Sequence, residues 1–153
     1  MKKLYLHIGT AKTGSSSIQK SLQTLQSDTL GFKCNNRGTG SIPDMEGFVW
    51  DMAKMNTDRT IYSNEWLFNA QPDFVEILAS KLRATFDTQV IVYIRRQDEY
   101  VVSRYQQASK NIEVESYAGP VALPEERDPM CDYYYKLEPW VRYFGRKNTH
   151  SPL

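Results

Sequence analysis

This chain of 153 residues has little cysteine and histidine, and it contains no long hydrophobic run. Its two cysteines, Cys34 and Cys131, lie far apart in a sequence without a secretory signal, which favours free thiols over a disulfide. The two histidines, His7 and His150, are isolated and form no metal-ligand spacing. The apolar run after the N-terminal lysines is too short for a signal peptide or a membrane span. We therefore expect a cytoplasmic protein with no transmembrane segment and no required metal.

The chain also has almost no net charge. Nineteen basic residues stand against eighteen acidic ones, which leaves a formal charge of +1 at pH 7. No global field therefore attracts nucleic acid or an anionic membrane, and we expect no nucleic-acid partner. The length suits a single domain that spans residues 1–153. Any anion that the protein binds must be held by local groups.

One stretch near the N-terminus has the composition of an anion-binding loop. Residues 3–8 alternate as in a β-strand, and residues 9–17 are small and polar apart from one lysine, Lys12. Apolar residues at helical spacing then predict a helix from about Ser15 to Gln26. Such a loop offers an anion its backbone N–H groups, the partial charge of the helix N-terminus and the full charge of the lysine. The alternative is a polar turn whose serines only cap the helix.

The loop differs from the P-loop of nucleotide hydrolases. That motif, G-x-x-x-x-G-K-[ST], places its lysine directly after the second glycine. In this chain Lys12 precedes Gly14. We therefore expect a loop that binds phosphate without being an ordinary ATP-binding loop.

Strands and helices alternate along the rest of the chain. The sequence predicts strands at 60–63 and 90–94, and helices that begin at Pro72, near Asp98 and at Pro129, the last one ending at Gly145. The expected core face of the helix after Pro72 carries Phe74, Ile77, Leu78, Leu82 and Phe86. The alternation predicts an α/β fold, with three α/β/α layers around a central parallel sheet, similar to that of P-loop nucleotide kinases.

Two long polar segments interrupt this alternation. Residues 29–58 and 111–129 are expected to be loops that are mobile or help to bind a substrate, with a hint of helix only at 45–55. The last strand, at 90–94, is a continuous apolar run and is expected to be buried on both faces. The C-terminal tail from residue 146 has a weak pattern and predicts no element.

Polar residues follow each predicted strand, where ligands bind in open parallel sheets. The end of the third strand is the most informative, because a metal-dependent NTPase would place an Asp there and this chain has Arg95. A guanidinium cannot help to bind a cation, but it can bind a second phosphate. Ser103 follows eight positions later, about two helical turns on, and its hydroxyl is placed to join Arg95 on the same anion. The sequence thus predicts a site for two anions.

These two motifs resemble those of a known family. Residues 6–17, Leu-His-Ile-Gly-Thr-Ala-Lys-Thr-Gly-Ser-Ser-Ser, look like the 5′-phosphosulfate loop of PAPS-dependent sulfotransferases. Residues 92–105, with Arg95 and Ser103, look like the 3′-phosphate motif of the same enzymes. PAPS is 3′-phosphoadenosine 5′-phosphosulfate, a donor with an anion at each end. The resemblance is strongest to bacterial-type and carbohydrate sulfotransferases.

The resemblance implies an activity and a role for each motif residue. A sulfuryl group would pass from PAPS to a hydroxyl or amine of a carbohydrate or small metabolite, leaving PAP. Lys12 would also offset the charge on the leaving oxygen. Arg95 and Ser103 would bind the 3′-phosphate, and Glu65 would act as general base, with His7 as the second candidate. The residues expected to bind the 5′-phosphosulfate are Lys12, Thr13, Gly14, Ser15, Ser16 and Ser17.

Two other functions stay open at this point. One is a P-loop nucleotide kinase or NTPase, against which the position of Lys12 and the absence of a strand-end Asp both argue. The other is a truncated nucleotide-binding domain of the same fold without turnover. Members of the family usually continue with a further strand and a loop that closes over the donor, whereas eight residues follow Gly145 here.

Overall fold

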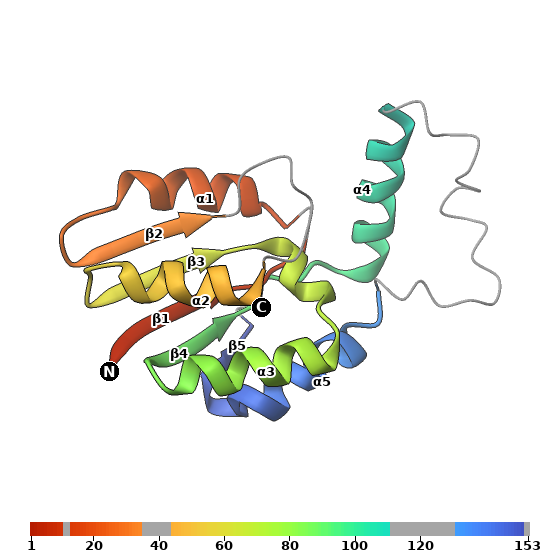
Figure 1. Ribbon diagram of the computed structural model, residues 1–153. Helices are drawn as coiled ribbons and strands as arrows, with labels where there is room; N and C mark the ends of the chain where they lie inside the picture. Colours follow the sequence, from red (N-terminus) through yellow and green to blue (C-terminus); the bar gives the residue numbers. More distant parts are fainter. Residues whose placement is uncertain (11–12, 35–43, 111–130, 152–153) are drawn as a thin grey trace.

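A five-stranded, all-parallel β-sheet forms the centre of the part of the chain that the computed structural model describes (Figure 1). The described residues are 1–10, 13–34, 44–110 and 131–151. The strands are β1 (Lys2–His7), β2 (Leu30–Cys34), β3 (Arg59–Ser63), β4 (Phe86–Ile91) and β5 (Thr149–His150). Their order in the sheet is β2-β3-β1-β4-β5, so β1 is central and has β3 and β4 as its neighbours. The carboxyl ends of these three strands therefore lie side by side.

Helices cover both faces of this sheet. They are α1 (Ser15–Thr24), α2 (Met45–Lys54), α3 (Pro72–Arg83), α4 (Gln97–Lys110) and α5 (Tyr133–Phe144), with 3₁₀ helices η1 (Glu65–Asn69) and η3 (Arg146–Asn148). Figure 1 shows α1 on one side of the sheet, α2, α3 and α5 on the other, and α4 standing away from it. The predicted α/β fold with three α/β/α layers is thereby confirmed.

The hydrophobic core lies between the sheet and the layer of α2, α3 and α5. Leu6 pairs in register with Val90, so both side chains point to this face, and both are fully buried. Trp140 of α5 is also fully buried and stacks on Phe144, with ring centroids 5.6 Å apart. Burial of such side chains supplies most of the favourable free energy of folding.

The opposite face is covered less completely. Phe32 of β2 is buried on the side where α1 packs, whereas Tyr5, Gln89 and Ile91 are only half-buried. The strand predicted at 90–94 to be buried on both faces therefore begins at Phe86, ends at Ile91 and has one partly open face. The residues before the apolar run alternate between buried and exposed, which is the pattern of a strand with one face partly open to solvent.

The predicted core face of α3 was right in part. Leu78 and Leu82 are buried and Phe74 packs against the core, whereas Ile77 is 49 % exposed. Val75 and Ala79, which were not predicted, are buried as well, so the buried stripe follows the i, i+3, i+4, i+7 pattern. The direction from which the sheet approaches the helix decides which residues complete the stripe beside Leu78 and Leu82. Phe86, assigned to the helix, begins β4 instead.

Two strands were missed. β2 lies within 29–58, which was expected to be a loop, and β5 lies in the tail that predicted no element. Leu30–Cys34 contains a glycine and a lysine, and β5 has only two residues, so neither shows a strand pattern by itself. Their backbones are held by β3 and β4 respectively. Residues 111–129, the other expected loop, lie outside the described residues.

The helix boundaries differ slightly from those expected. α4 begins one residue before Asp98, and the Tyr100 amide donates to the carbonyl of Arg96, so Asp98 is not its cap. α5 begins at Tyr133 with Asp132 as its cap, whereas the start expected at Pro129 lies outside the described residues. Gly145 follows the last residue of α5 with φ +88°, as the prediction required.

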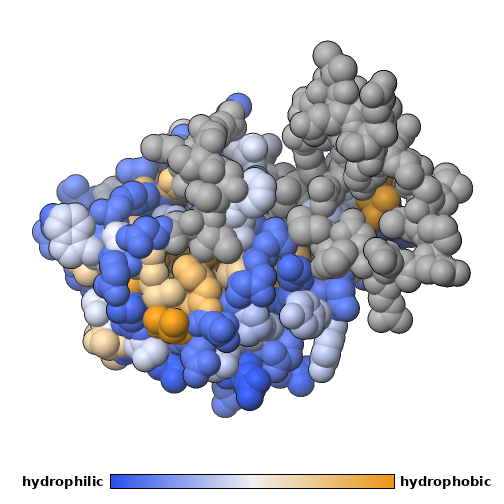
Figure 2. Space-filling model, turned by 45° about the vertical axis from the view of Figure 1, so that its right-hand side comes forward, coloured by the Kyte–Doolittle hydropathy of each residue, from blue (hydrophilic) through white to orange (hydrophobic). Residues whose placement is uncertain are grey.

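The described surface is mostly hydrophilic on the side shown in Figure 2, apart from a small hydrophobic area. Within the described ranges, no helix combines the length and the hydrophobicity that crossing a membrane requires.

Cys34 and Cys131 are both free thiols, as predicted.

We predict that Trp140→Ala lowers the free energy of unfolding by about 3–5 kcal/mol, because it leaves a large cavity beneath the sheet. Urea denaturation measures this change. Tyr134→Ala is the matched control, since Tyr134 is on the same helix and 84 % exposed; it should change stability by less than about 0.5 kcal/mol. A similar effect of the two substitutions would contradict the central position of Trp140.

Candidate functional site

The junction between β1 and α1 leaves the N-terminus of α1 open. Gly14 precedes the helix with φ +81°, a left-handed conformation that glycine adopts without strain, and no side chain among the described residues caps the helix. The Thr13 hydroxyl donates to the carbonyl of Thr10 at 2.7 Å and closes the turn before it. Ser16 and Ser17 are exposed in the first helical turn. This arrangement is typical of a helix N-terminus that binds an anion.

Lys12, the cation expected to bind the 5′-phosphosulfate, lies outside the described residues. The part of the loop before Lys12 is nevertheless tied to the segment that leads to Arg95. The Thr10 amide donates to the carbonyl of Tyr93 at 3.2 Å. A Cβ at Gly9 would lie 2.6 Å from Nε2 of His7 and 3.3 Å from the Tyr93 amide nitrogen. Only glycine therefore fits at this first position of the loop.

Glu65 lies against the same junction. The hydroxyl of the buried Ser15 donates to Oε2 of Glu65 at 2.6 Å. The Glu65 backbone is fixed by the preceding residue, because Asn64 accepts a hydrogen bond from the Trp66 amide and its own amide donates to the carbonyl of His7. The structure thus brings together two of the predicted site residues, a carboxylate and a loop serine, from elements 50 residues apart.

His7 is enclosed beneath the loop. Its Nδ1 lies 2.7 Å from Oγ of Ser63, and that oxygen also accepts a hydrogen bond from the Gln19 side chain at 3.0 Å. Only 2 % of His7 is exposed, and burial lowers the pKa of its imidazole to about 4. The ring is therefore neutral at physiological pH, and its burial keeps it out of reach of a substrate molecule. His7 supports the loop, so the second candidate for the base is unsuited to that role.

Arg95 and Ser103 line the same cavity, of about 300 Å³, beside the start of α4. The cavity also contains carboxylates, since Nε of Arg95 donates to Oε2 of Glu99 at 2.9 Å and Arg96 pairs with Asp98. Both partners of the Arg95–Glu99 pair are more than a third exposed, and such pairs contribute only about 0–1 kcal/mol. A phosphate can therefore compete with Glu99 for the guanidinium.

One residue near this cavity was missed by the sequence reasoning. The Tyr133 hydroxyl donates to the backbone carbonyl of Arg95 at 2.7 Å. Burial raises the pKa of Tyr133 to about 12, so the hydroxyl keeps its proton and remains a donor. Nothing in the sequence distinguishes it from Tyr134 and Tyr135, which follow it directly.

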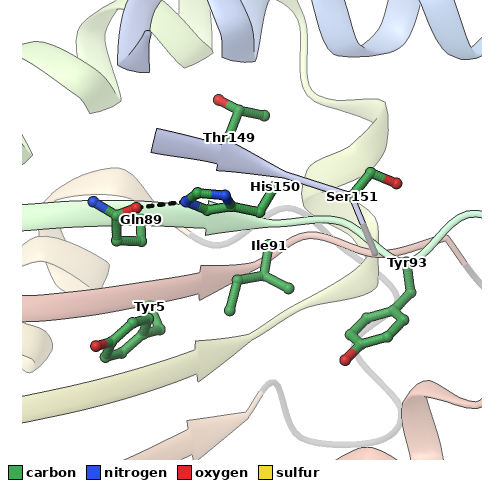
Figure 3. Close-up of a pocket in the computed structure, with 7 residues that line it drawn as sticks. All are labelled: Tyr5, Gln89, Ile91, Tyr93, Thr149, His150 and Ser151. Atoms are coloured by element: carbon green, nitrogen blue, oxygen red, sulfur yellow. Dashed lines mark hydrogen bonds between the residues drawn. The ribbon is translucent and has the colours of Figure 1, made fainter. Parts of the chain in front are cut away.

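A second cavity, of about 570 Å³, lies on the partly open face of the sheet. Figure 3 shows Tyr5, Ile91 and Tyr93 pointing to the same side of the strands, and His150 meeting Gln89 across the edge at 2.7 Å. Thr149 and Ser151 complete its lining. None of the predicted site residues lines it, although Tyr93 belongs to the segment 92–105 that carries the second motif.

Comparisons with known proteins show no family for this chain. Neither family models nor curated sequences gave a match to this chain. Among solved structures, the chain is similar to a gluconokinase from Sinorhizobium meliloti 1021, with a TM-score of 0.49 and 9 % sequence identity. The similarity covers 97 % of this chain and 81 % of that one. A likeness of this extent carries no argument about the fold, the activity or the substrate.

We predict that the buried imidazole makes stability fall in mildly acidic solution. The unfolded chain protonates His7 near pH 6.5 and the folded protein only near pH 4, so protons bind preferentially to the unfolded chain between these values. The contribution of His7 to the free energy of unfolding is fully present above pH 6.5 and falls as the pH drops toward 4. The loss between pH 7 and pH 5 is about 2 kcal/mol.

Urea unfolding of wild-type protein and of His7→Gln at both pH values measures this effect. The variant should lose less stability on acidification, whatever its stability at pH 7. His150→Gln, which replaces an exposed imidazole, is the control and should keep the wild-type fall. An equal fall in His7→Gln would show that other groups cause it.

Proposed function

We propose that this protein is a PAPS-dependent sulfotransferase, which transfers a sulfuryl group from PAPS to a hydroxyl or amine of a carbohydrate or small-molecule acceptor. The observation that carries the proposal is the cavity that Arg95 and Ser103 share. This cavity lies just after β4 in the chain. β4 is the neighbour of β1, the strand that leads into the open N-terminus of α1. Two anion sites on adjacent strands suit a donor with a phosphosulfate at one end and a phosphate at the other.

In the proposed complex the loop binds the 5′-phosphosulfate. Lys12 supplies the charge, and residues 13–17 supply backbone amides and hydroxyls. Arg95 and Ser103 bind the 3′-phosphate through a charged and a neutral donor. PAP, the product, keeps both phosphates and therefore binds the same two sites.

The reaction needs a base and a stabilised leaving group. The acceptor oxygen or nitrogen attacks sulfur, the bond from sulfur to the bridging phosphate oxygen breaks, and the acceptor proton must be removed. Glu65 is the proposed base, and its hydrogen bond to Ser15 places its carboxylate beside the loop. Lys12 offsets the negative charge that grows on the departing oxygen.

Two alternatives make different demands on the same residues. A P-loop kinase or NTPase would use a magnesium nucleotide, and its turnover would not depend on Arg95. A non-catalytic domain of this fold would bind PAP but transfer nothing. The experiments below separate the three.

We predict that Arg95→Ala weakens PAP binding by about 10- to 100-fold in isothermal calorimetry, because the 3′-phosphate loses a charge-assisted hydrogen bond. Arg96→Ala is the matched control, since Arg96 is the next residue, 76 % exposed and paired with Asp98. It should leave PAP affinity within about threefold of wild type. Absence of PAP binding, or magnesium-dependent ATP turnover that survives Arg95→Ala, would favour the kinase.

We predict that Glu65→Gln slows sulfuryl transfer by about 10²- to 10⁴-fold, as expected for loss of a general base. PAP binding should not weaken, because the substitution removes a negative charge from the anion site. Transfer of radiolabelled sulfate from PAPS to a panel of glycans measures the first effect, and calorimetry the second. Transfer at the wild-type rate would exclude Glu65 as the base, and wild-type protein that binds PAP without any transfer would indicate the non-catalytic domain.

A further inference from the structure

Two hydrogen bonds tie the turn that carries Arg95 to the beginning of α5. The Tyr133 hydroxyl donates to the carbonyl of Arg95 at 2.7 Å, and the Gln97 side chain donates to the carbonyl of Cys131 at 2.6 Å. These contacts join segments 34 to 38 residues apart in the sequence. The segment between β4 and α4 is thus fixed by residues at the beginning of α5, in addition to the strand and helix that it connects.

Tyr133 is itself held in place. Its ring packs edge-on against Phe68 of η1, with centroids 5.8 Å apart and planes at 80°. The Asp132 side chain caps α5 by accepting a hydrogen bond from the Tyr135 amide, and Trp140 anchors the helix in the core. Because burial raises the pKa of Tyr133 to about 12, its hydroxyl donates throughout the physiological range.

The partner of the Arg95 side chain on α4 is exposed, in contrast. The Arg95 side chain is itself 39 % exposed and pairs with Glu99, which lies four positions later on α4. An anion that displaces Glu99 binds most tightly if the backbone of Arg95 already points the guanidinium toward it. Less conformational freedom is then lost on binding. The hydrogen bond from Tyr133 supplies this orientation without touching the anion.

We propose that Tyr133 is a positioning residue for the second anion site, acting through the backbone of Arg95 so that its guanidinium and Ser103 face one cavity. The role rests on the proposed function, in which that cavity binds the 3′-phosphate of PAPS. Neither Tyr134 nor Tyr135 shares it, since they are 84 % and 60 % exposed.

The test compares Tyr133→Phe with Tyr134→Phe, two substitutions that each remove one hydroxyl from adjacent residues. Calorimetry with PAP and with 5′-AMP, which lacks the 3′-phosphate, gives the ratio of the two affinities. Tyr133→Phe should weaken PAP binding by about three- to tenfold, the range expected for one hydrogen bond, and leave 5′-AMP binding unchanged. Tyr134→Phe should change neither affinity.

A double-mutant cycle tests whether the effect passes through Arg95. In an Arg95→Ala background, Tyr133→Phe should cause no further loss of PAP affinity. Thermal unfolding shows whether Tyr133→Phe stays folded. Gln97→Ala removes the second hydrogen bond from an exposed side chain, and it should also weaken PAP binding without changing 5′-AMP binding, by a smaller factor.

The outcomes separate this role from the proposed function. Unchanged PAP affinity in Tyr133→Phe, an equal loss for PAP and 5′-AMP, or a loss that persists without Arg95 would each overturn the role of Tyr133 and leave the sulfotransferase proposal standing. Wild-type protein that binds no PAP would overturn the sulfotransferase proposal itself.

Discussion

The close packing of His7 beneath the loop is the constraint on which the rest of the site depends. Its imidazole meets Ser63 at the end of β3 and, edge-on, the ring of Tyr93 after β4, with centroids 5.4 Å apart. Gly9 lies directly above it, where no side chain fits. Because the ring is buried and neutral, it holds three strand ends together without placing a buried charge among them.

Both proposed anion sites follow from this arrangement. The parallel sheet places β1 between β3 and β4, so residues that follow these strands meet at one edge. Ser15 and Glu65 meet on one side of the β1 loop, and the segment between β4 and Arg95 lies on the other. The second site depends on a further contact, in which α5 approaches the turn before α4 through Tyr133.

Local patterns were enough to predict the elements that carry most of the site. The alternation at 3–8, the Gly/Ser/Thr loop and the helix after it all have short-range signals, as do β3 and the helix that Pro72 begins. β2 and β5 had no such signal, because their strand conformation comes from pairing with neighbours. The stripe of α3 that faces the core was predicted only in part for a related reason. Leu78 and Leu82 are buried as expected, but the sheet decides that Val75 and Ala79 join them and Ile77 does not.

The sequence by itself determined the α/β class. It also predicted an anion-binding loop after β1, and it places an arginine where a metal-dependent NTPase would have an aspartate. These features depend on residue types and spacings within a few turns of chain. Only the tertiary structure decided that Glu65 meets Ser15, that His7 is buried and neutral, and that Tyr133 supports Arg95. Each of these contacts joins residues 38 to 56 positions apart, and no local pattern records which distant side chain will arrive.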